Sequence, residues 1–167
     1  MQPQNQPMAL FAEYRENEDA EIGRGRVLGS GSTMTILLID DSRMLRQAQE
    51  RALTKAGYEV VTASDGEEGL RIARESNPDL ILLDIMLPKI AGQDVLRTLK
   101  RDPRTKHIPV LVLTGLSTAN APKLINEGAL CFLEKTDELM ENNCQGIVQA
   151  VKVVLSKSNC LNEISWH

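Results

Sequence analysis

The chain has 167 residues, of which 42% are hydrophobic, 25% are charged and only 3% are aromatic, and its formal net charge is −4. A chain of this length holds one domain with a core of its own, and the low aromatic content predicts that Leu, Ile, Val and Ala form that core. The slightly acidic balance excludes the basic surface typical of a protein that binds nucleic acid directly.

The sequence carries no targeting or membrane signal. No apolar run approaches the ~20 residues that a membrane-spanning helix requires, and the N-terminus lacks the basic and then apolar order of a signal peptide. Three cysteines, Cys131, Cys144 and Cys160, form no Cys-x-x-Cys pair and have no flanking histidines. These features predict a cytoplasmic protein with reduced thiols and without membrane insertion.

The composition changes near residue 34. Residues 1–34 combine Pro, a run of acidic residues and a Gly/Ser-rich end, which predicts a flexible leader. Leu10, Phe11 and Tyr14 stand at helical spacing, so a short partner-docking helix over residues 8–16 is the alternative interpretation. We expect the folded domain to span 35–157 and a polar C-terminal tail to occupy 158–167.

Five short apolar runs rich in branched residues predict β-strands. Four are continuous, as expected for parallel strands buried on both faces, and the second is more mixed, as expected near an edge of the sheet. The predicted strands are Thr35–Ile39, Tyr58–Ala63, Leu80–Leu83, Pro109–Leu113 and Leu130–Leu133.

Helical patterns lie between and after these strands. The second helix is predicted to open at Asp65, with Glu68 in the capping-box position, and to end before Asn77. The first helix shows an apolar stripe that Gly57 closes: Leu45, Ala48, Ala52 and Ala56. The other helices are predicted to end at Asp102-Pro103, to span 119–127, and to run from Met140 to Leu155. Strands that alternate with helices in this way predict a doubly wound α/β fold, a five-stranded parallel sheet with five helices on its two faces.

Polar residues stand where four of the predicted strands end. Asp40 and Asp41 follow the first strand, Asp84 the third and Thr114 the fourth, while Lys135 comes just after the fifth. Ligands of open parallel sheets bind at this edge, so we expect these side chains to converge. Three converging carboxylates repel one another, and Mg²⁺ is the hard, oxygen-liganded cation that relieves the repulsion. The carboxylates, the hydroxyl, the ammonium and a bound cation together suit the binding of a phosphoryl group. A carboxylate can also accept that group itself, as an acyl phosphate.

Four segments carry a resemblance to one family: Ile39–Ser42, Leu83–Gly92, Leu113–Gly115 and Phe132–Lys135. In order and spacing they are similar to the receiver domain of two-component response regulators, of the chemotaxis-regulator type. The resemblance covers about Thr35 to Lys157. It implies a flavodoxin-like strand order 2-1-3-4-5 and a phosphoacceptor signalling domain. Such a domain is not an enzyme beyond its own phosphorylation and autodephosphorylation.

The resemblance assigns roles to the acidic residues. Asp84 is expected to accept the phosphoryl group from a phosphohistidine. Asp41, Asp84 and the backbone carbonyl of Met86 are expected to ligate Mg²⁺, for which Mn²⁺ can substitute, while Asp40 acts through water.

Thr114 and Lys135 are expected, from the same resemblance, to bind phosphoryl oxygens, and Thr114 with Phe132 to form a switch. In the family, phosphorylation draws the threonine inward and the aromatic residue fills the vacated space. The face formed by the fourth helix, fifth strand and fifth helix is then remodelled. An ordinary core position is the alternative interpretation of Phe132.

Two departures from the family bear on the chemistry. The family usually has Pro, often after a cis bond, where this chain has Thr136, so the loop either keeps a strained cis bond or rearranges. Met86 and Leu116 lie two residues after Asp84 and Thr114, where the family tunes hydrolysis, and both are apolar. Since neither can orient an attacking water, we expect a phosphoryl state that lasts minutes or more.

The resemblance implies that a histidine kinase or a histidine phosphotransfer protein docks at Arg43, Met44, Leu45 and Arg46, although a plain helix surface explains the same residues. The tail is too short and the leader too polar for an output domain. We therefore expect a stand-alone receiver that acts through a downstream protein on its remodelled face. Homodimerisation on phosphorylation is left open.

Two other functions share part of this pattern. An Asp-based phosphohydrolase of the haloacid dehalogenase type requires an Asp-x-Asp pattern after the first strand and a substrate-capping insertion, whereas Asp40 and Asp41 are adjacent. A receiver-fold scaffold that works without phosphorylation is favoured by Thr136 and opposed by the complete acidic set. No phosphate-binding glycine motif supports nucleotide binding.

Overall fold

The computed structural model describes residues 32–115 and 121–164, and within them five parallel strands form one sheet. The strands are β1 (Thr35–Ile39), β2 (Glu59–Ala63), β3 (Leu80–Asp84), β4 (Val110–Thr114) and β5 (Cys131–Glu134). Their order across the sheet is β2-β1-β3-β4-β5, which confirms the expected strand order.

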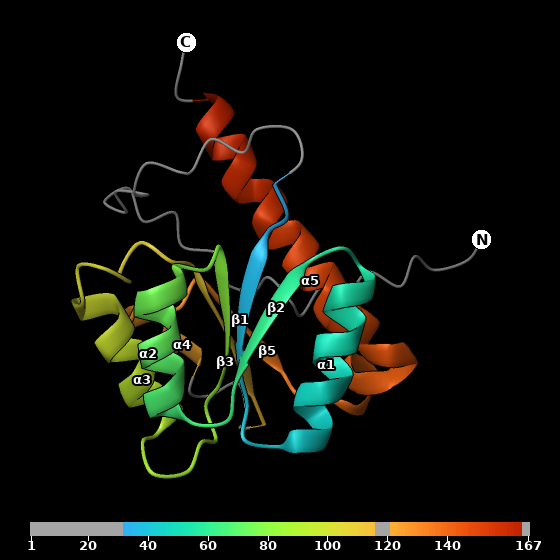
Figure 1. Cartoon of the computed structure of the whole chain (residues 1–167), viewed down its shortest axis with the longest axis horizontal. Helices are drawn as coiled ribbons and strands as arrows, with labels where there is room; N and C mark the ends of the chain where they lie inside the picture. The colour runs from blue at the N-terminus through green and yellow to red at the C-terminus, as the bar shows by residue number, and fades with distance from the viewer. Residues whose placement is uncertain (1–31, 116–120, 165–167) are drawn as a thin grey trace.

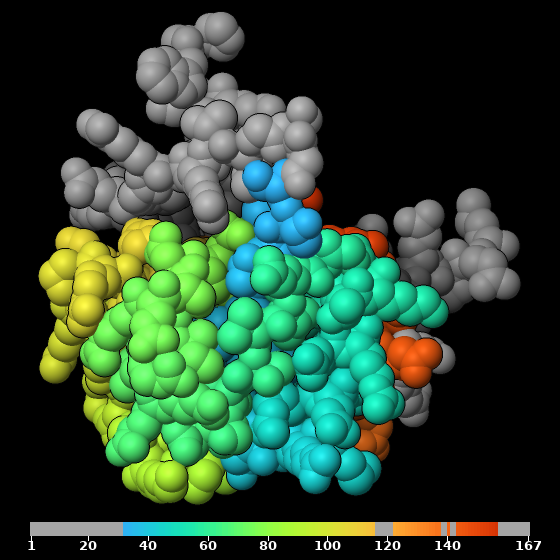
Figure 2. Space-filling view, viewed as in Figure 1, coloured from blue at the N-terminus to red at the C-terminus, as the bar shows by residue number. Residues whose placement is uncertain are grey.

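Helices cover both faces of the sheet. They are α1 (Arg43–Lys55), α2 (Gly66–Ser76), α3 (Gly92–Arg101), α4 (Ala121–Asn126) and α5 (Asp137–Ile164). Figure 1 looks toward the β2 edge and places α1 and α5 on one side of the sheet and α2, α3 and α4 on the other. In the space-filling view, side chains close the space between α1 and α2 along this edge (Figure 2). The predicted doubly wound architecture is confirmed.

Side chains alternate between two apolar cores, one on each face of the sheet. In β1, Ile36 and Leu38 face the core shared with α1 and α5, whereas Leu37 and Ile39 face the core shared with α2, α3 and α4. β3 and β4 are buried along their whole length, which explains why their sequences are continuous apolar runs. β2 lies at an edge, as its mixed sequence predicts.

The last three strands end one residue later than their apolar runs. Asp84, Thr114 and Glu134 are the final residues of β3, β4 and β5. The cause is the parallel ladder, which still pairs Asp84 with Leu113 and Thr114 with Glu134. The sheet itself therefore positions the first polar residue at each strand end.

The buried face of α1 differs from the predicted stripe. Ala48 is exposed, whereas Gln49, Ala52 and Leu53 are buried. These three residues stand at i, i+3 and i+4, so they share one face of the helix. The large Leu53 side chain sets the inward direction, and it brings a polar residue, Gln49, into the core.

A variant of the predicted capping box opens α2, in which Asp65 caps the helix and Glu68 bonds back to Ser64 instead of Asp65. The backbone N–H of Glu68 donates to Asp65 Oδ1 at 2.9 Å, and the Glu68 carboxylate accepts from the backbone N–H of Ser64 at 2.8 Å. The helix ends at Asn77, whose left-handed φ of 45° stops it before Pro78.

The C-terminal elements differ in length from the prediction. Within the described residues α4 spans Ala121–Asn126 and ends one residue before the predicted 127, and α5 runs to Ile164, past the expected domain end at 157. Within α5, Asn143 and Cys144 have left-handed φ values of 57° and 59°. The proposed leader helix over 8–16, Leu116 and residues 165–167 lie outside the described residues. Across 32–115 and 121–164, no helix combines the length and apolarity needed to cross a bilayer.

Candidate functional site

Three carboxylates converge at the carboxyl ends of the central strands. β1 and β3 are neighbours, so Asp40, directly after β1, lies beside Asp84, the last residue of β3. Asp40, Asp41 and Asp84 offer oxygens that all lie within 4.8 Å of one another. Asp40 and Asp84 are buried, whereas Asp41 is exposed. We call this group the acidic pocket.

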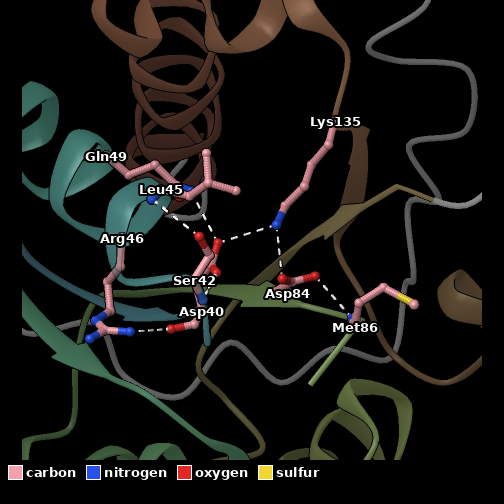
Figure 3. Close-up of polar contacts among 8 residues, drawn as sticks. All are labelled: Asp40, Ser42, Leu45, Arg46, Gln49, Asp84, Met86 and Lys135. Atoms are coloured by element: carbon pink, nitrogen blue, oxygen red, sulfur yellow. Dashed lines mark hydrogen bonds and ion pairs between the residues drawn. The ribbon is translucent and has the colours of Figure 1, made fainter. Parts of the chain in front are cut away.

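Asp40 is held on both carboxylate oxygens (Figure 3). Its Oδ1 accepts a 2.8 Å hydrogen bond from the backbone N–H of Ser42. Its Oδ2 accepts a 3.2 Å hydrogen bond from Gln49 Nε2 and lies 3.2 Å from the ammonium of Lys135. A carboxylate that is 0% exposed requires such partners, because an unpaired charge in a core is costly.

Lys135 bridges the two buried carboxylates. Its Nζ lies 2.8 Å from Asp84 Oδ2 and 3.2 Å from Asp40 Oδ2. Burial lowers the pKa of the ammonium, but hydrogen bonding and attraction to the two carboxylates outweigh burial, so the pKa of Lys135 is raised. All described peptide bonds are trans, including that to Thr136, and the backbone N–H of Lys135 donates to the Thr114 carbonyl at 2.7 Å. The loop therefore accommodates Thr136 while Lys135 keeps its contacts with Asp40 and Asp84.

Asp84 is less exposed to water than a carboxylate usually is, and burial raises its pKa. Hydrogen bonds from Lys135 and from the backbone N–H of Met86, which reaches Asp84 Oδ1 at 2.9 Å, act in the opposite direction. Behind Asp84 the chain passes close to itself at Gly92, where a Cβ atom would lie 2.5 Å from the Cα of Ile85. Asp84 is thus held in one orientation by groups on both of its oxygens.

The donor set fits a hard divalent cation. Carboxylate oxygens are the ligands that Mg²⁺ prefers, and the three carboxylates are close enough to share one ion. A single ammonium, that of Lys135, lies against two of these three negative charges. The acidic pocket therefore keeps a net negative charge that a cation would balance.

Thr114 and Phe132 lie on the same face of the sheet. Thr114 is buried at the end of β4 and follows the alternation that places Val110 and Val112 in the core shared with α2, α3 and α4. Phe132 is partly buried against that core, and β5 pairs it with Val112. The two residues expected to form the switch are thus diagonal neighbours on adjacent strands.

The residues expected to dock a partner form the first turn of α1, beside the acidic pocket. Arg43 and Met44 are exposed, Met44 to 82%, while Leu45 and Arg46 are half-buried. Arg46 Nη1 donates to the Asp40 carbonyl at 2.7 Å. Arg46 therefore also fixes the β1–α1 connection, in addition to any role at a surface.

Gln49 is the residue of this site that sequence reasoning missed. A single glutamine on a helix does not by itself indicate a functional site. The apolar stripe predicted for α1 also placed Ala48, and not Gln49, on the buried face. The signal was its spacing from Ala52 and Leu53, which puts the amide on the inward face one helical turn beyond Leu45.

Known proteins share this sequence and architecture. Residues 36–142 match the family model of the response regulator receiver domain. The DNA-binding dual master transcriptional regulator RpaA of Synechocystis is 48% identical over 133 residues, which make up 79% of this chain and 53% of RpaA. The polar-differentiation response regulator DivK of Brucella ovis is 33% identical over 96 residues, which make up 58% of this chain and 78% of DivK.

Solved structures give the same result. A response regulator receiver domain protein from Clostridium thermocellum superposes with a TM-score of 0.66 at 34% identity, covering 77% of this chain and 98% of that one. The chain spans about half the length of RpaA, so the similarity concerns only part of that protein. The family match takes in β1 from Ile36, the other four strands whole and every residue of the acidic pocket, and on that ground the chain belongs to the response regulator receiver domain family.

Proposed function

We propose that this receiver domain accepts a phosphoryl group on Asp84 from a histidine kinase or a histidine phosphotransfer protein. An Asp84 carboxylate oxygen attacks the phosphorus of the phosphohistidine. A P–O bond forms, the P–N bond breaks, and the imidazole nitrogen takes the electron pair. Apart from the later hydrolysis of this acyl phosphate, the domain carries out no further chemistry, so it signals and does not turn over a substrate. The observation that carries this proposal is the pairing of Asp84 with Lys135 at 2.8 Å inside the acidic pocket.

Each neighbouring group has a part in the transfer. Lys135 pairs with one phosphoryl oxygen and Thr114 donates its hydroxyl to another. Asp41, Asp84 and the backbone carbonyl of Met86 hold the metal, with Asp40 acting through water. Mg²⁺, or Mn²⁺ in its place, neutralises phosphoryl charge when bound there.

The output is a change of surface. Movement of Thr114 toward the phosphoryl group vacates space on the face where Phe132 lies, and the surface of α4, β5 and α5 is then remodelled for a downstream protein. We assign residues 35–157 to the receiver, 1–34 to a leader and 158–167 to a tail. The expected partners are proteins rather than nucleic acid or membrane, and the setting is the cytoplasm.

Intact mass spectrometry tests the phosphoacceptor. Incubation with acetyl phosphate and Mg²⁺ should add the mass of one phosphoryl group to the wild type, and chelation of the metal should prevent the gain. Asp84→Asn should remain unmodified, whereas Asp94→Asn, an exposed aspartate of α3, should gain the mass like the wild type. An unmodified wild type would overturn the assignment in favour of a phosphorylation-independent scaffold, and a modified Asp84→Asn would show that another residue accepts the phosphoryl group.

The lifetime of the phosphoryl group can be measured in the same assay. Met86 is 58% exposed at the mouth of the acidic pocket and carries no polar atom that could orient water. We expect the purified, phosphorylated protein to keep the group for minutes, and Met86→Asn to shorten that time by placing an amide beside Asp84. A wild-type lifetime of seconds would contradict this expectation.

A further inference from the structure

Gln49 occupies an unusual position for a polar residue. It lies in the second turn of α1, is 0% exposed, and shares its buried face with Ala52 and Leu53. Its amide points toward the acidic pocket, where Nε2 donates a 3.2 Å hydrogen bond to Asp40 Oδ2.

Packing does not explain a glutamine at this position. Its Oε1 atom is buried and has no hydrogen-bond partner among the described residues, so the surrounding core does not pair with the amide oxygen. An apolar side chain of the same length would fill the space without that cost. Among the described residues, the contact with Asp40 is what holds the polar end of this side chain.

The same Asp40 oxygen is shared with Lys135, whose Nζ lies 3.2 Å away, while Nζ lies closer, 2.8 Å, to Asp84. When Lys135 pairs with a phosphoryl oxygen on Asp84, it turns toward that group. Asp40 then keeps the Ser42 N–H on Oδ1, but Gln49 is left as the side-chain donor on Oδ2. A fully buried carboxylate cannot lose its last donor on one oxygen without moving or taking up water.

We infer that Gln49 is a positioning residue of the phosphorylation centre: it holds the Asp40 carboxylate in place while Lys135 engages the phosphoryl group. This inference rests on the proposed function of Asp84. In the unphosphorylated protein the amide duplicates a contact that Lys135 also makes. In the phosphorylated protein Gln49 is the side-chain donor that remains on Oδ2, so the amide contributes more to the phosphorylated state than to the resting one.

A pair of matched substitutions on α1 tests the inference. Gln49→Met keeps the length of the side chain and removes the amide, and Gln47→Met makes the same change at an exposed position of the same helix. With acetyl phosphate, Gln49→Met should lower the maximal phosphorylation rate by about tenfold, because it removes a hydrogen bond to a charged group. The Mg²⁺ concentration at half-maximal rate should stay within about twofold of the wild type, since the carboxylates themselves are unchanged. Gln47→Met should match the wild type in both quantities.

A second arm needs no phosphorylation. Urea unfolding midpoints are measured at neutral pH for Gln49→Met, Lys135→Met and the double variant. Gln49→Met alone should not lower the midpoint, because Lys135 still pairs with Asp40 and the unpaired amide oxygen is removed. In the Lys135→Met background the same change should lower the midpoint further, because Asp40 Oδ2 then has neither side-chain donor. The double variant should therefore lose more than the sum of the single losses.

The outcomes separate this inference from the proposed function. A wild type that gains no phosphoryl group overturns the proposed function and with it the role of Gln49 in phosphorylation. A wild type that is phosphorylated while Gln49→Met reacts at the same maximal rate overturns the inference alone. Additive urea shifts in the double variant also overturn it, because Gln49 would then not replace Lys135 as a donor to Asp40.

Discussion

Asp40 and Asp84 are the same residue type at the ends of neighbouring strands, yet their surroundings suit them to different tasks. Asp40 is enclosed by Ser42, Gln49 and Lys135 and is 0% exposed. Asp84 has the Met86 N–H on one oxygen and Lys135 on the other. Burial raises the pKa of Asp84, and the lysine opposes that effect, which favours the ionised form that a nucleophile requires.

The lowered pKa of Asp102, which lies at the end of the domain away from the acidic pocket, leads to a prediction about acid stability. A backbone hydrogen bond from Arg104, followed by the side chain of Arg74, lowers the pKa of Asp102 to about 2. A carboxylate with a lowered folded-state pKa stabilises the fold above its unfolded pKa of about 4 and loses that effect as the pH falls through about 2. Asp102→Asn should therefore have a lower urea midpoint than the wild type at neutral pH, and the two midpoints should converge between about pH 4 and pH 2.

The control is Glu75→Gln, which removes an exposed carboxylate paired with Arg71 and should change the midpoint little. Midpoints for the wild type and Asp102→Asn that stay equally far apart down to the lowest pH would contradict the prediction.

Among the elements, α3 begins without a side-chain cap. Its N-cap residue is Ala91, which makes no capping hydrogen bond, in contrast to Ser42 at α1 and Asp65 at α2. Ala91→Asp should raise the free energy of unfolding by about 1 kcal/mol, because its carboxylate can accept from the first free N–H groups of the helix. Urea denaturation measures this gain. Ala91→Val has no acceptor and should bring none, and a gain of equal size would show that capping is not the cause.

Gly92, the first residue of α3, ties the helix to the phosphoacceptor. A Cβ atom there would lie 2.5 Å from the Cα of Ile85 and would also meet the carbonyl oxygen of Asp84. Gly92→Ala should cost about 1–3 kcal/mol of stability, since backbone atoms must shift. It should also slow phosphorylation by moving Asp84. Gly115→Ala is the stability control, because a Cβ atom at Gly115 has nothing within 4 Å, and equal losses in the two variants would contradict the steric explanation.

At the scale of the whole molecule, α4 is attached to the rest of the domain through its neighbours. α4 has six residues, fewer than a helix needs to be stable by itself. It is held by Leu124 and Ile125 in the core and by Glu127 just after its end. Glu127 Oε1 accepts from Arg97 at 2.7 Å and from Gln93 at 2.6 Å, both on α3.

Arg97→Met should therefore loosen α4 locally. Hydrogen exchange should speed up over residues 121–130, because Glu127 loses its cation while its Oε2 is already buried without a partner. Exchange in β1 and β3 should not change, since they lie in the interior of the sheet. Arg71→Met removes an exposed ion pair on α2 and serves as the control. Faster exchange throughout the sheet would show a global loss of stability instead.

The positions of Asp40, Asp84 and Thr114 could be predicted because each follows an apolar run that only a buried parallel strand explains, and parallel strands end at one edge. The Asp65 capping box could be predicted because it is local in sequence. The face of α1 that is buried could not be predicted from the sequence. A stripe of small alanines does not show which side of a helix faces inward, and the contact that decides it is that of Leu53 with the sheet and α5.

The sequence by itself thus determined the strands, their order through the family resemblance, and the residues of the acidic pocket, because hydrophobic period and motif spacing are properties of the chain alone. Only the tertiary structure decided the details that join distant segments. Lys135 reaches Asp40 across 95 positions of sequence, and Glu127 reaches Arg97 across 30. Gln49 acquires a partner only because α1 packs with that face against the sheet. Such contacts depend on how elements are placed in space, and no local pattern in the chain specifies that placement.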